Sequence, residues 1–257
     1  MIELPPAAPT GANALEIHDL TGPAGSPVLH GVSLAVPRGG THVVLGSIHA
    51  GKSLLLRLVL GLQRSDHGIV VVDGTPFDAA RPNEDELRRI RRHVGVVFES
   101  SALVSRLTLL ENVELPLVEH TAVGAEAARA AATELLREVG VAGDIDRTPE
   151  VRSRLDRRRA ALARALVLRP IVLLIDEPAH GLDAHAAAEL DDTLARLQQQ
   201  YGCAALICSQ EVRYAFRAPR AVSVLAGGTI VEQGDLEQLR RSRHDAVRRL
   251  VDRRGAA

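Results

Sequence analysis

The sequence predicts an α/β fold with a mixed sheet core, an antiparallel strand region and a helical subdomain. Continuous apolar runs at 41–45 and 171–175 are typical of parallel strands that are buried on both faces. Short apolar runs between 15 and 36 alternate with turn signals, which indicates antiparallel strands. The stretch from 107 to about 168 is rich in Ala, Leu, Glu and Arg, which favours helices.

Shorter elements follow from the same periodicities. Residues 1–13 are rich in Pro, Ala and Gly, so we expect a loose lead-in. A buried helix is predicted from Lys52 to about Leu62, because its positions are apolar on nearly all sides. Further strands are expected at 69–72, 94–98 and 204–208, and an amphipathic helix at 186–199. A hairpin around Gly227-Gly228 is expected to join strands at 222–225 and 229–232.

These elements suggest a simple division of the chain. We expect one domain from 14 to 234, with a helical subdomain at about 100–168. A helical, Arg-rich tail is expected at 235–257.

The composition excludes several classes of protein. The chain has 257 residues, of which 46% are hydrophobic, and a net charge of −1, so no global field attracts nucleic acid. Aromatic residues make up 2%, which leaves few platforms for base stacking. No apolar stretch reaches the roughly 18 residues of a membrane-spanning helix, and the N-terminus lacks a signal-peptide pattern. We therefore expect a cytoplasmic chain, for which any membrane role must come through a partner.

Residues 46–53 fit the pattern G-x-x-x-x-G-K-[ST], with a predicted strand before it and a buried helix after it. Backbone N–H groups of such a loop surround phosphates, and the helix directs its positive end at them. Lys52 would reach the β- and γ-phosphates, and the Ser53 hydroxyl would bind Mg²⁺. A chance match is the alternative, and the strand and helix argue against it. The predicted ATP-binding residues are Gly46, Ser47, Ile48, His49, Ala50, Gly51, Lys52, Ser53 and Leu54.

Two acids follow the apolar run 171–175. Asp176 is placed to hold Mg²⁺ through water, and Glu177 is placed to orient or deprotonate an attacking water. The alternative is that both acids cap the N-terminus of the next helix. That reading explains Asp-Glu-Pro but not its pairing with the phosphate loop upstream, so we favour the catalytic reading.

Together these motifs resemble the ABC-type ATPases over nearly the whole chain. Ile175-Asp176-Glu177-Pro178 followed by Gly181-Leu182-Asp183 is similar to the Walker B and D-loop sequence of that family. Other matching segments are 29–34 before the P-loop, 108–113 at the start of the helical subdomain, and 162–165 after the signature motif. The resemblance implies a P-loop NTPase fold, ATP and Mg²⁺ as ligands, and a dimer of ATPase subunits beneath an integral-membrane permease.

Finer details resemble the Mla/Mce-type lipid-transport ATPases. The matching segments are 66–68, 98–103, 116–121 and 245–251. This resemblance implies that the transported substrate is phospholipid or another lipid, and that an Mce-domain lipid-binding protein is a further partner. It also implies a place on the inner face of the cell membrane, held there by the permease.

Several positions depart from the family pattern. His49 stands where the P-loop has Gly, which restricts the backbone, although His tolerates left-handed geometry better than most residues. The segment 18–28 has no aromatic residue to stack on adenine. Glu99 replaces the Q-loop glutamine and could still bind Mg²⁺ through its carboxylate. Gln210 replaces the switch histidine and keeps a neutral hydrogen-bond donor at that catalytic position.

The signature motif departs furthest. It reads Arg152-Ser153-Arg154-Leu155-Asp156, so side chains replace the glycines that allow close approach to a γ-phosphate. Arg154 could supply compensating charge. Losing one preorganised donor typically costs about 10²–10³ in rate, whereas binding depends mainly on the loop backbone, Lys52 and Mg²⁺.

Two hypotheses remain open for the activity. The first is an ATP-hydrolysing subunit, which the retained Glu177 favours. The second is a catalytically weak nucleotide-binding subunit with a structural or regulatory role, which the altered signature and Gln210 favour. In a homodimer both ATP sites would contain every altered residue, whereas a heterodimer with an intact partner would restore part of each site. A soluble ABC protein of translation or DNA repair is a third reading, but those proteins carry tandem nucleotide domains or long insertions.

The remaining features have ordinary explanations. Cys203 and Cys208 are predicted to be small buried hydrophobes in a reducing compartment. The run 157–159 of three arginines is predicted to form a solvated helix face, and the arginines of the tail likewise. A contact of the tail with the permease or the opposite subunit is the sharper alternative.

Overall fold

A computed structural model describes residues 11–22, 29–216 and 221–251. The described residues form two compact units. One unit comprises 92–203, and the other comprises the described residues before 92 and after 203. The lead-in before residue 11 and the end of the tail, 252–257, lie outside the described residues.

The second unit, which contains the P-loop, has an antiparallel sheet and a mixed sheet. The antiparallel sheet has the order β2-β1-β4-β5, with bounds Val32–Pro37, Asn13–Thr21, His67–Val72 and Thr75–Asp78. In the mixed sheet, β3 pairs in parallel with β8 and β9, and β9 pairs antiparallel with β10. Their bounds are Thr41–Leu45, Ala204–Ser209, Val222–Ala226 and Thr229–Gly234.

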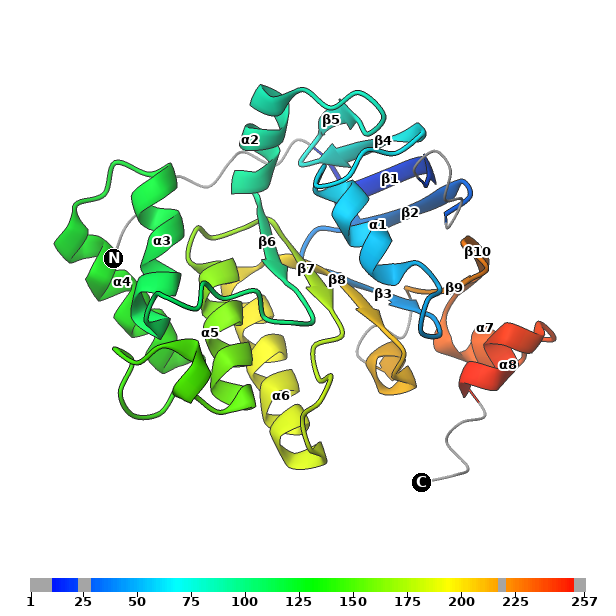
Figure 1. Ribbon diagram of the computed structural model, residues 1–257. Helices are drawn as coiled ribbons and strands as arrows, with labels where there is room; N and C mark the ends of the chain where they lie inside the picture. The colour runs from blue at the N-terminus through cyan, green and yellow to red at the C-terminus, as the bar shows by residue number, and fades with distance from the viewer. Residues whose placement is uncertain (1–10, 23–28, 217–220, 252–257) are drawn as a thin grey trace. The chain divides into compact units, whose positions relative to one another are not determined.

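Short helices accompany these sheets, as Figure 1 shows in cyan, orange and red. They are α1 (Lys52–Val59), α2 (Glu84–Arg92), the 3₁₀ turn Val212–Phe216, α7 (Leu236–Arg240) and α8 (Asp245–Val251). Helix α1 ends earlier than the predicted Leu62 because the chain turns at Gly61, whose φ of 60° suits glycine.

The unit of residues 92–203 combines a strand pair with a helical cluster. Strands β6 (Val94–Val97) and β7 (Val172–Asp176) pair in parallel. Helix α5 packs against α3, α4, α6 and β6, and Figure 1 shows α3, α4 and α5 together. The helices are α3 (Leu109–His120), α4 (Ala125–Glu138), the 3₁₀ turn Pro149–Val151, α5 (Arg154–Leu166) and α6 (Ala184–Tyr201).

The predicted fold class is confirmed by these elements, with the antiparallel strands, mixed sheet and helical region in the expected parts of the chain. Cys203 and Cys208 are both buried and unbridged, as predicted, and burial raises the pKa of the Cys203 thiol to about 11. Among the described residues, no helix is both long and apolar enough to cross a bilayer.

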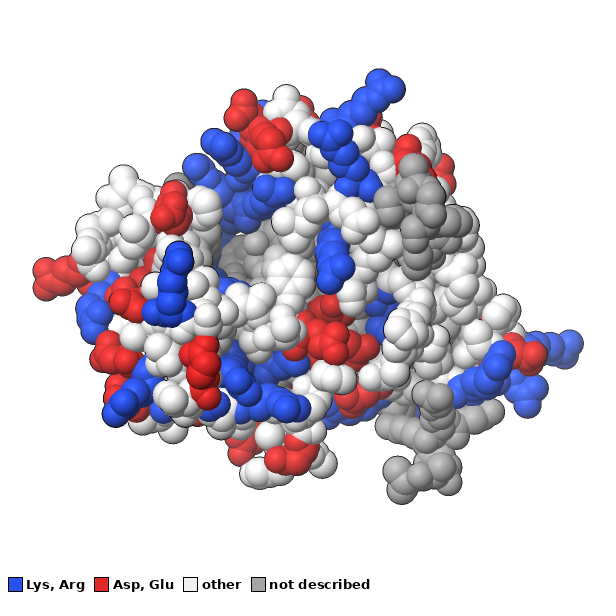
Figure 2. Space-filling view, in the orientation of Figure 1, with Lys and Arg blue, Asp and Glu red and all other residues white. Residues whose placement is uncertain are grey.

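The surface charges are mixed in sign. Figure 2 shows basic and acidic side chains interspersed over the face in view, in keeping with a net charge of −1. Basic side chains gather where α7 and α8 lie, at the right of that view. The exposed arginines of this segment are Arg240, Arg241, Arg243, Arg248 and Arg249.

Candidate functional site

The P-loop follows a fully paired strand. β3 lies between β8 and β9, so its carboxyl end opens at the centre of a sheet, where α/β proteins commonly bind ligands. The Gly46 amide donates to the Ser209 carbonyl at 3.1 Å. A Cβ atom at Gly46 would lie 2.8 Å from the Leu225 carbonyl oxygen, so the turn has room only for glycine there.

Two residues of this turn have a left-handed backbone conformation. His49 has a φ of 67° and Gly51 a φ of 103°, and the Ala50 amide closes the turn on the Ser47 carbonyl at 3.2 Å. The histidine thus adopts the geometry expected of glycine at this position. His49 and Ile48 are exposed, and Ile48 retains 64% of its accessible surface.

Lys52 brings the positive charge into this turn. Its side chain is only 6% exposed, and its ammonium donates to the carbonyls of Gly46 and Ser47 at 2.9 and 3.0 Å. The charge therefore lies against the concave backbone of the loop. Ser53 and Leu54 are half-buried in the first turn of α1.

The N-terminus of α1 differs from those of four other described helices. The caps of α3, α5, α6 and α7 are side-chain oxygens that accept backbone N–H groups. In the described structure, α1 has a glycine cap with no side-chain acceptor, and no acid in its first turn. Because the first turn of α1 contains no carboxylate, the positive end of this helix suits an anion.

The strand β3 that supports this loop contains a buried histidine. His42 contacts the Ala35 carbonyl at 2.9 Å and the Ser223 hydroxyl at 2.8 Å. Burial lowers the pKa of His42, partly offset by the contact with the Ala35 carbonyl. The neutral ring therefore links β3 to its neighbours without placing a charge beneath the P-loop.

The acidic pair ends β7 in the other unit. Asp176 and Glu177 are 3% and 8% exposed, and Glu177 has a left-handed φ of 43°. Strained residues of this kind cluster at functional sites. The cap of α6 is Asp183, which accepts from the Ala186 amide at 2.9 Å; that hydrogen bond lowers the pKa of Asp183. The capping alternative for Asp176 and Glu177 is therefore excluded.

The donor chemistry suits magnesium. Ser53, Asp176 and Glu99 offer hydroxyl and carboxylate oxygens, the ligand type that Mg²⁺ prefers. Among the described residues, no three His, Cys, Asp or Glu side chains form a metal cage.

Glu99 and Gln210, which are predicted to replace family residues, have specific neighbours. The Glu99 carboxylate lies 3.3 Å from His180 Nε2, and both side chains are about half exposed. Gln210 directly follows Ser209, the residue whose carbonyl holds Gly46, so it lies at the sheet end where the P-loop begins.

The segment 152–156, which is predicted to be an altered signature motif, lies at the start of α5. The Ser153 hydroxyl caps the helix by accepting from the Asp156 amide at 3.0 Å, and Arg152 pairs with Asp156 at 3.0 Å. Arg154 donates to the Gly181 carbonyl of the same chain at 2.6 Å. A Cβ at Gly181 would lie 1.8 Å from that guanidinium, so the arginine covers the glycine.

The prediction of a solvated face at 157–159 is wrong. Arg158 is 3% exposed and donates to the carbonyls of Phe98 and His180 at 2.8 and 3.2 Å. Arg159 pairs with Glu189 at 2.7 Å. The spacing could have revealed Arg158, because it precedes the buried Ala161 and Leu162 by three and four positions on one helix face.

Comparisons with known proteins identify the family. The family model described as ABC transporter matches residues 29–180. Methionine import ATP-binding protein MetN 1 of Rhodococcus jostii is 35% identical over 220 residues, which are 86% of this chain and 64% of that protein. The probable ribonucleotide transport ATP-binding protein mkl of Mycobacterium leprae is 35% identical over 242 residues, covering 94% of this chain and 69% of that protein. The chain thus spans less than two thirds of the length of the Rhodococcus relative.

Solved structures agree with this assignment. A dimeric ATP-binding cassette in a post-hydrolysis state, bound to ADP and phosphate, has a TM-score of 0.78 and 27% identity, covering 86% of this chain and 98% of that chain. The protein cbiO1 from Clostridium perfringens, part of the cbiONQ transporter complex, shares the fold with a TM-score of 0.77 at 23% identity, over 95% of this chain and 96% of that chain. The chain therefore belongs to the ABC transporter family, as an ATP-binding subunit with the P-loop NTPase fold.

Proposed function

We propose that this chain binds ATP with Mg²⁺ at residues 46–53 and hydrolyses it to energise a membrane permease. The observation that carries the proposal is the turn at the start of α1, which combines Lys52 with a helix end that has no carboxylate of its own. Backbone N–H groups of the turn and the Lys52 ammonium would bind the phosphates.

The remaining roles follow from residue chemistry. When bound, Mg²⁺ neutralises charge on the phosphates, and Ser53, Asp176 and Glu99 are its proposed protein ligands. Glu177 would orient the attacking water and accept its proton. Gln210 would donate a hydrogen bond from the position where the family has a histidine, without contributing a positive charge.

The proposed assembly is an ATPase dimer beneath an integral-membrane permease, on the cytoplasmic face of the membrane. We propose phospholipid or another lipid as the substrate and an Mce-domain lipid-binding protein as a further partner, because segments 66–68 and 98–103 resemble the Mla/Mce-type ATPases. The relatives' names give methionine and ribonucleotides as cargoes of those proteins. Photo-crosslinking of lipid to the complex with its permease tests the substrate, and labelling by methionine or ribonucleotide analogues in place of lipid would contradict it.

Glu177→Gln provides the test of the hydrolytic role. The amide keeps the size of the side chain but cannot accept the proton, so we expect ATP turnover to fall by about 10²–10⁴-fold. ATP affinity, measured by calorimetric titration, should be retained because the P-loop is unchanged. Full turnover in this variant would contradict the proposal.

A second candidate function is nucleotide binding with slow hydrolysis. Arg154 and Leu155 stand where the family has glycines, and Arg154 is bound to the Gly181 carbonyl of its own chain. Turnover of the purified chain, alone and with its permease and partner ATPase, separates the two candidates. Turnover that stays absent in the complete assembly supports the second candidate over the first.

A further inference from the structure

Two loops of the unit 92–203 meet at helix α5. The first loop follows β6 and contains Phe98 and Glu99, and the second follows β7 and contains Glu177 and His180. Arg158, in the second turn of α5, donates to the Phe98 carbonyl at 2.8 Å and to the His180 carbonyl at 3.2 Å. One side chain therefore links the two loops directly.

Because Arg158 is buried, its charged group has lost its contact with water. The residue is 3% exposed, and a charged group is placed there only when hydrogen bonds replace its hydration. The guanidinium is a planar fork whose donors have fixed directions, so two carbonyls bound by it are held at a fixed separation. Lysine has the same charge but no such fork.

The link continues to the proposed catalytic base. The amide of His180, whose carbonyl Arg158 binds, donates to the Glu177 carbonyl at 3.0 Å. Glu177 has the left-handed φ of 43°, and such a conformation persists only when its surroundings hold it. Arg158 is thus one hydrogen bond removed from the backbone of Glu177.

Two exposed contacts lie at the same junction. Arg154 donates to the Gly181 carbonyl at 2.6 Å, and His180 lies 3.3 Å from the Glu99 carboxylate. Exposed pairs of this kind contribute little free energy. The buried Arg158 is therefore the contact that we expect to dominate.

We propose that Arg158 is a positioning residue that holds the backbone of the Glu177 turn against the loop of Glu99. The proposal rests on the proposed ATPase function for its effect on rate. It predicts that loss of the guanidinium displaces Glu177 while leaving the P-loop intact, since the P-loop belongs to the other compact unit.

The test compares Arg158→Gln and Arg158→Lys with the matched control Arg159→Gln. Arg159 is the next residue of α5, but its guanidinium pairs with Glu189 on α6 instead of the two loops. We expect kcat to fall by about 10–100-fold in both Arg158 variants, since a displacement of about 1 Å can cost this much. ATP affinity, measured without Mg²⁺ so that it does not depend on the proposed ligands Glu99 and Asp176, should stay unchanged in all three, and Arg159→Gln should keep the wild-type kcat.

Hydrogen exchange of the peptide 177–183 supplies a readout that does not need turnover. Faster exchange there in the Arg158 variants, but not in Arg159→Gln, supports the proposal even if the wild-type chain hydrolyses no ATP, in which case only the proposed function fails. Unchanged exchange overturns the proposal, and so does an unchanged kcat in an active enzyme. A joint loss of ATP affinity and kcat also overturns it, because it indicates general destabilisation. If Arg158→Gln does not fold, Arg158→Lys gives the same decision.

Discussion

At the scale of single residues, the P-loop contains a histidine in a conformation that suits glycine. His49 has a φ of 67°, and a side chain in this left-handed region costs about 1–2 kcal/mol. Glycine would carry no such cost at this position. The chain therefore keeps the shape of the loop at the expense of stability.

A pair of variants tests this strain. His49→Gly removes it, whereas His49→Ala removes the imidazole and keeps a Cβ in the left-handed region. We expect the free energy of unfolding of His49→Gly to exceed that of His49→Ala by about 1 kcal/mol. Urea denaturation of both proteins gives the comparison, and an alanine variant as stable as the glycine variant would refute the assigned strain.

Individual buried polar residues were harder to predict than apolar ones. The burial of Cys203 and Cys208 followed from their apolar surroundings. Arg158 was predicted to be solvated because three consecutive arginines are typical of an exposed face. Its two partners, Phe98 and His180, are distant in sequence, so only the fold shows that their carbonyls accept hydrogen bonds from the guanidinium.

At the scale of elements, strongly apolar segments were predicted best. The run 41–45 is β3, and the hairpin at Gly227-Gly228 joins β9 and β10, because burial and turn chemistry both favour one structure. The strand β5 and the helix α2 were missed. β5 has only four residues and contains Pro76, so its pattern is weak. α2 is amphipathic, with Leu87 and Ile90 three positions apart on its buried face, so its spacing could have revealed it.

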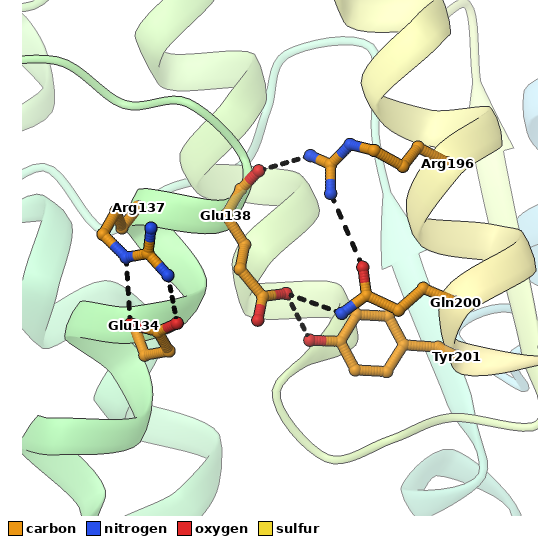
Figure 3. Close-up of polar contacts among 6 residues, drawn as sticks. All are labelled: Glu134, Arg137, Glu138, Arg196, Gln200 and Tyr201. Atoms are coloured by element: carbon orange, nitrogen blue, oxygen red, sulfur yellow. Dashed lines mark hydrogen bonds and ion pairs between the residues drawn. The ribbon is translucent and has the colours of Figure 1, made fainter.

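Helices α4 and α6 are joined at their C-terminal ends by a polar cluster, shown in Figure 3. The Glu138 carboxylate accepts from the Tyr201 hydroxyl at 2.6 Å and from Gln200 at 3.5 Å, and the Glu138 carbonyl accepts from Arg196 at 2.5 Å. Arg169 lies over the Tyr201 ring, 4.3 Å from its centroid. The cluster therefore ties the helical subdomain to α6.

Tyr201→Phe tests this connection because it removes only the hydroxyl and keeps the ring under Arg169. We expect the free energy of unfolding at neutral pH to fall by about 1 kcal/mol. Burial, with the Glu138 hydrogen bond, raises the pKa of Tyr201 to about 12 in the folded protein. The contribution is complete below the ordinary tyrosine pKa of about 10 and is lost as the pH rises through about 12.

Denaturation of both proteins across this pH range gives the measurement. The difference between wild type and Tyr201→Phe should be constant below about pH 10 and shrink above it. A difference that grows with rising pH would contradict the assigned direction. No difference at neutral pH would show that the cluster does not stabilise the fold.

At the scale of the whole molecule, the predicted binding and catalytic positions are distributed over both compact units. The P-loop pattern is complete and lies in one compact unit. The positions that are predicted to depart from the family's signature and Q-loop, 152–156 and Glu99, lie in the unit of residues 92–203. The sequence alone predicted the family and the fold class, because both depend on local patterns, whereas the roles of the loop 46–53 and of Asp176 and Glu177 stay predictions. The contacts of Arg154, Arg158 and Glu99 could not be predicted, because they join segments distant in sequence.

ATP titration of wild type and Lys52→Ala is the most direct test of the central claim that residues 46–53 bind nucleotide. Arg57→Ala, an exposed change on the same helix, serves as the control. The account predicts measurable binding by wild type and control, and a loss of at least about 10–100-fold in Lys52→Ala, which lacks the charged donor. Equal affinity in all three proteins would contradict the account.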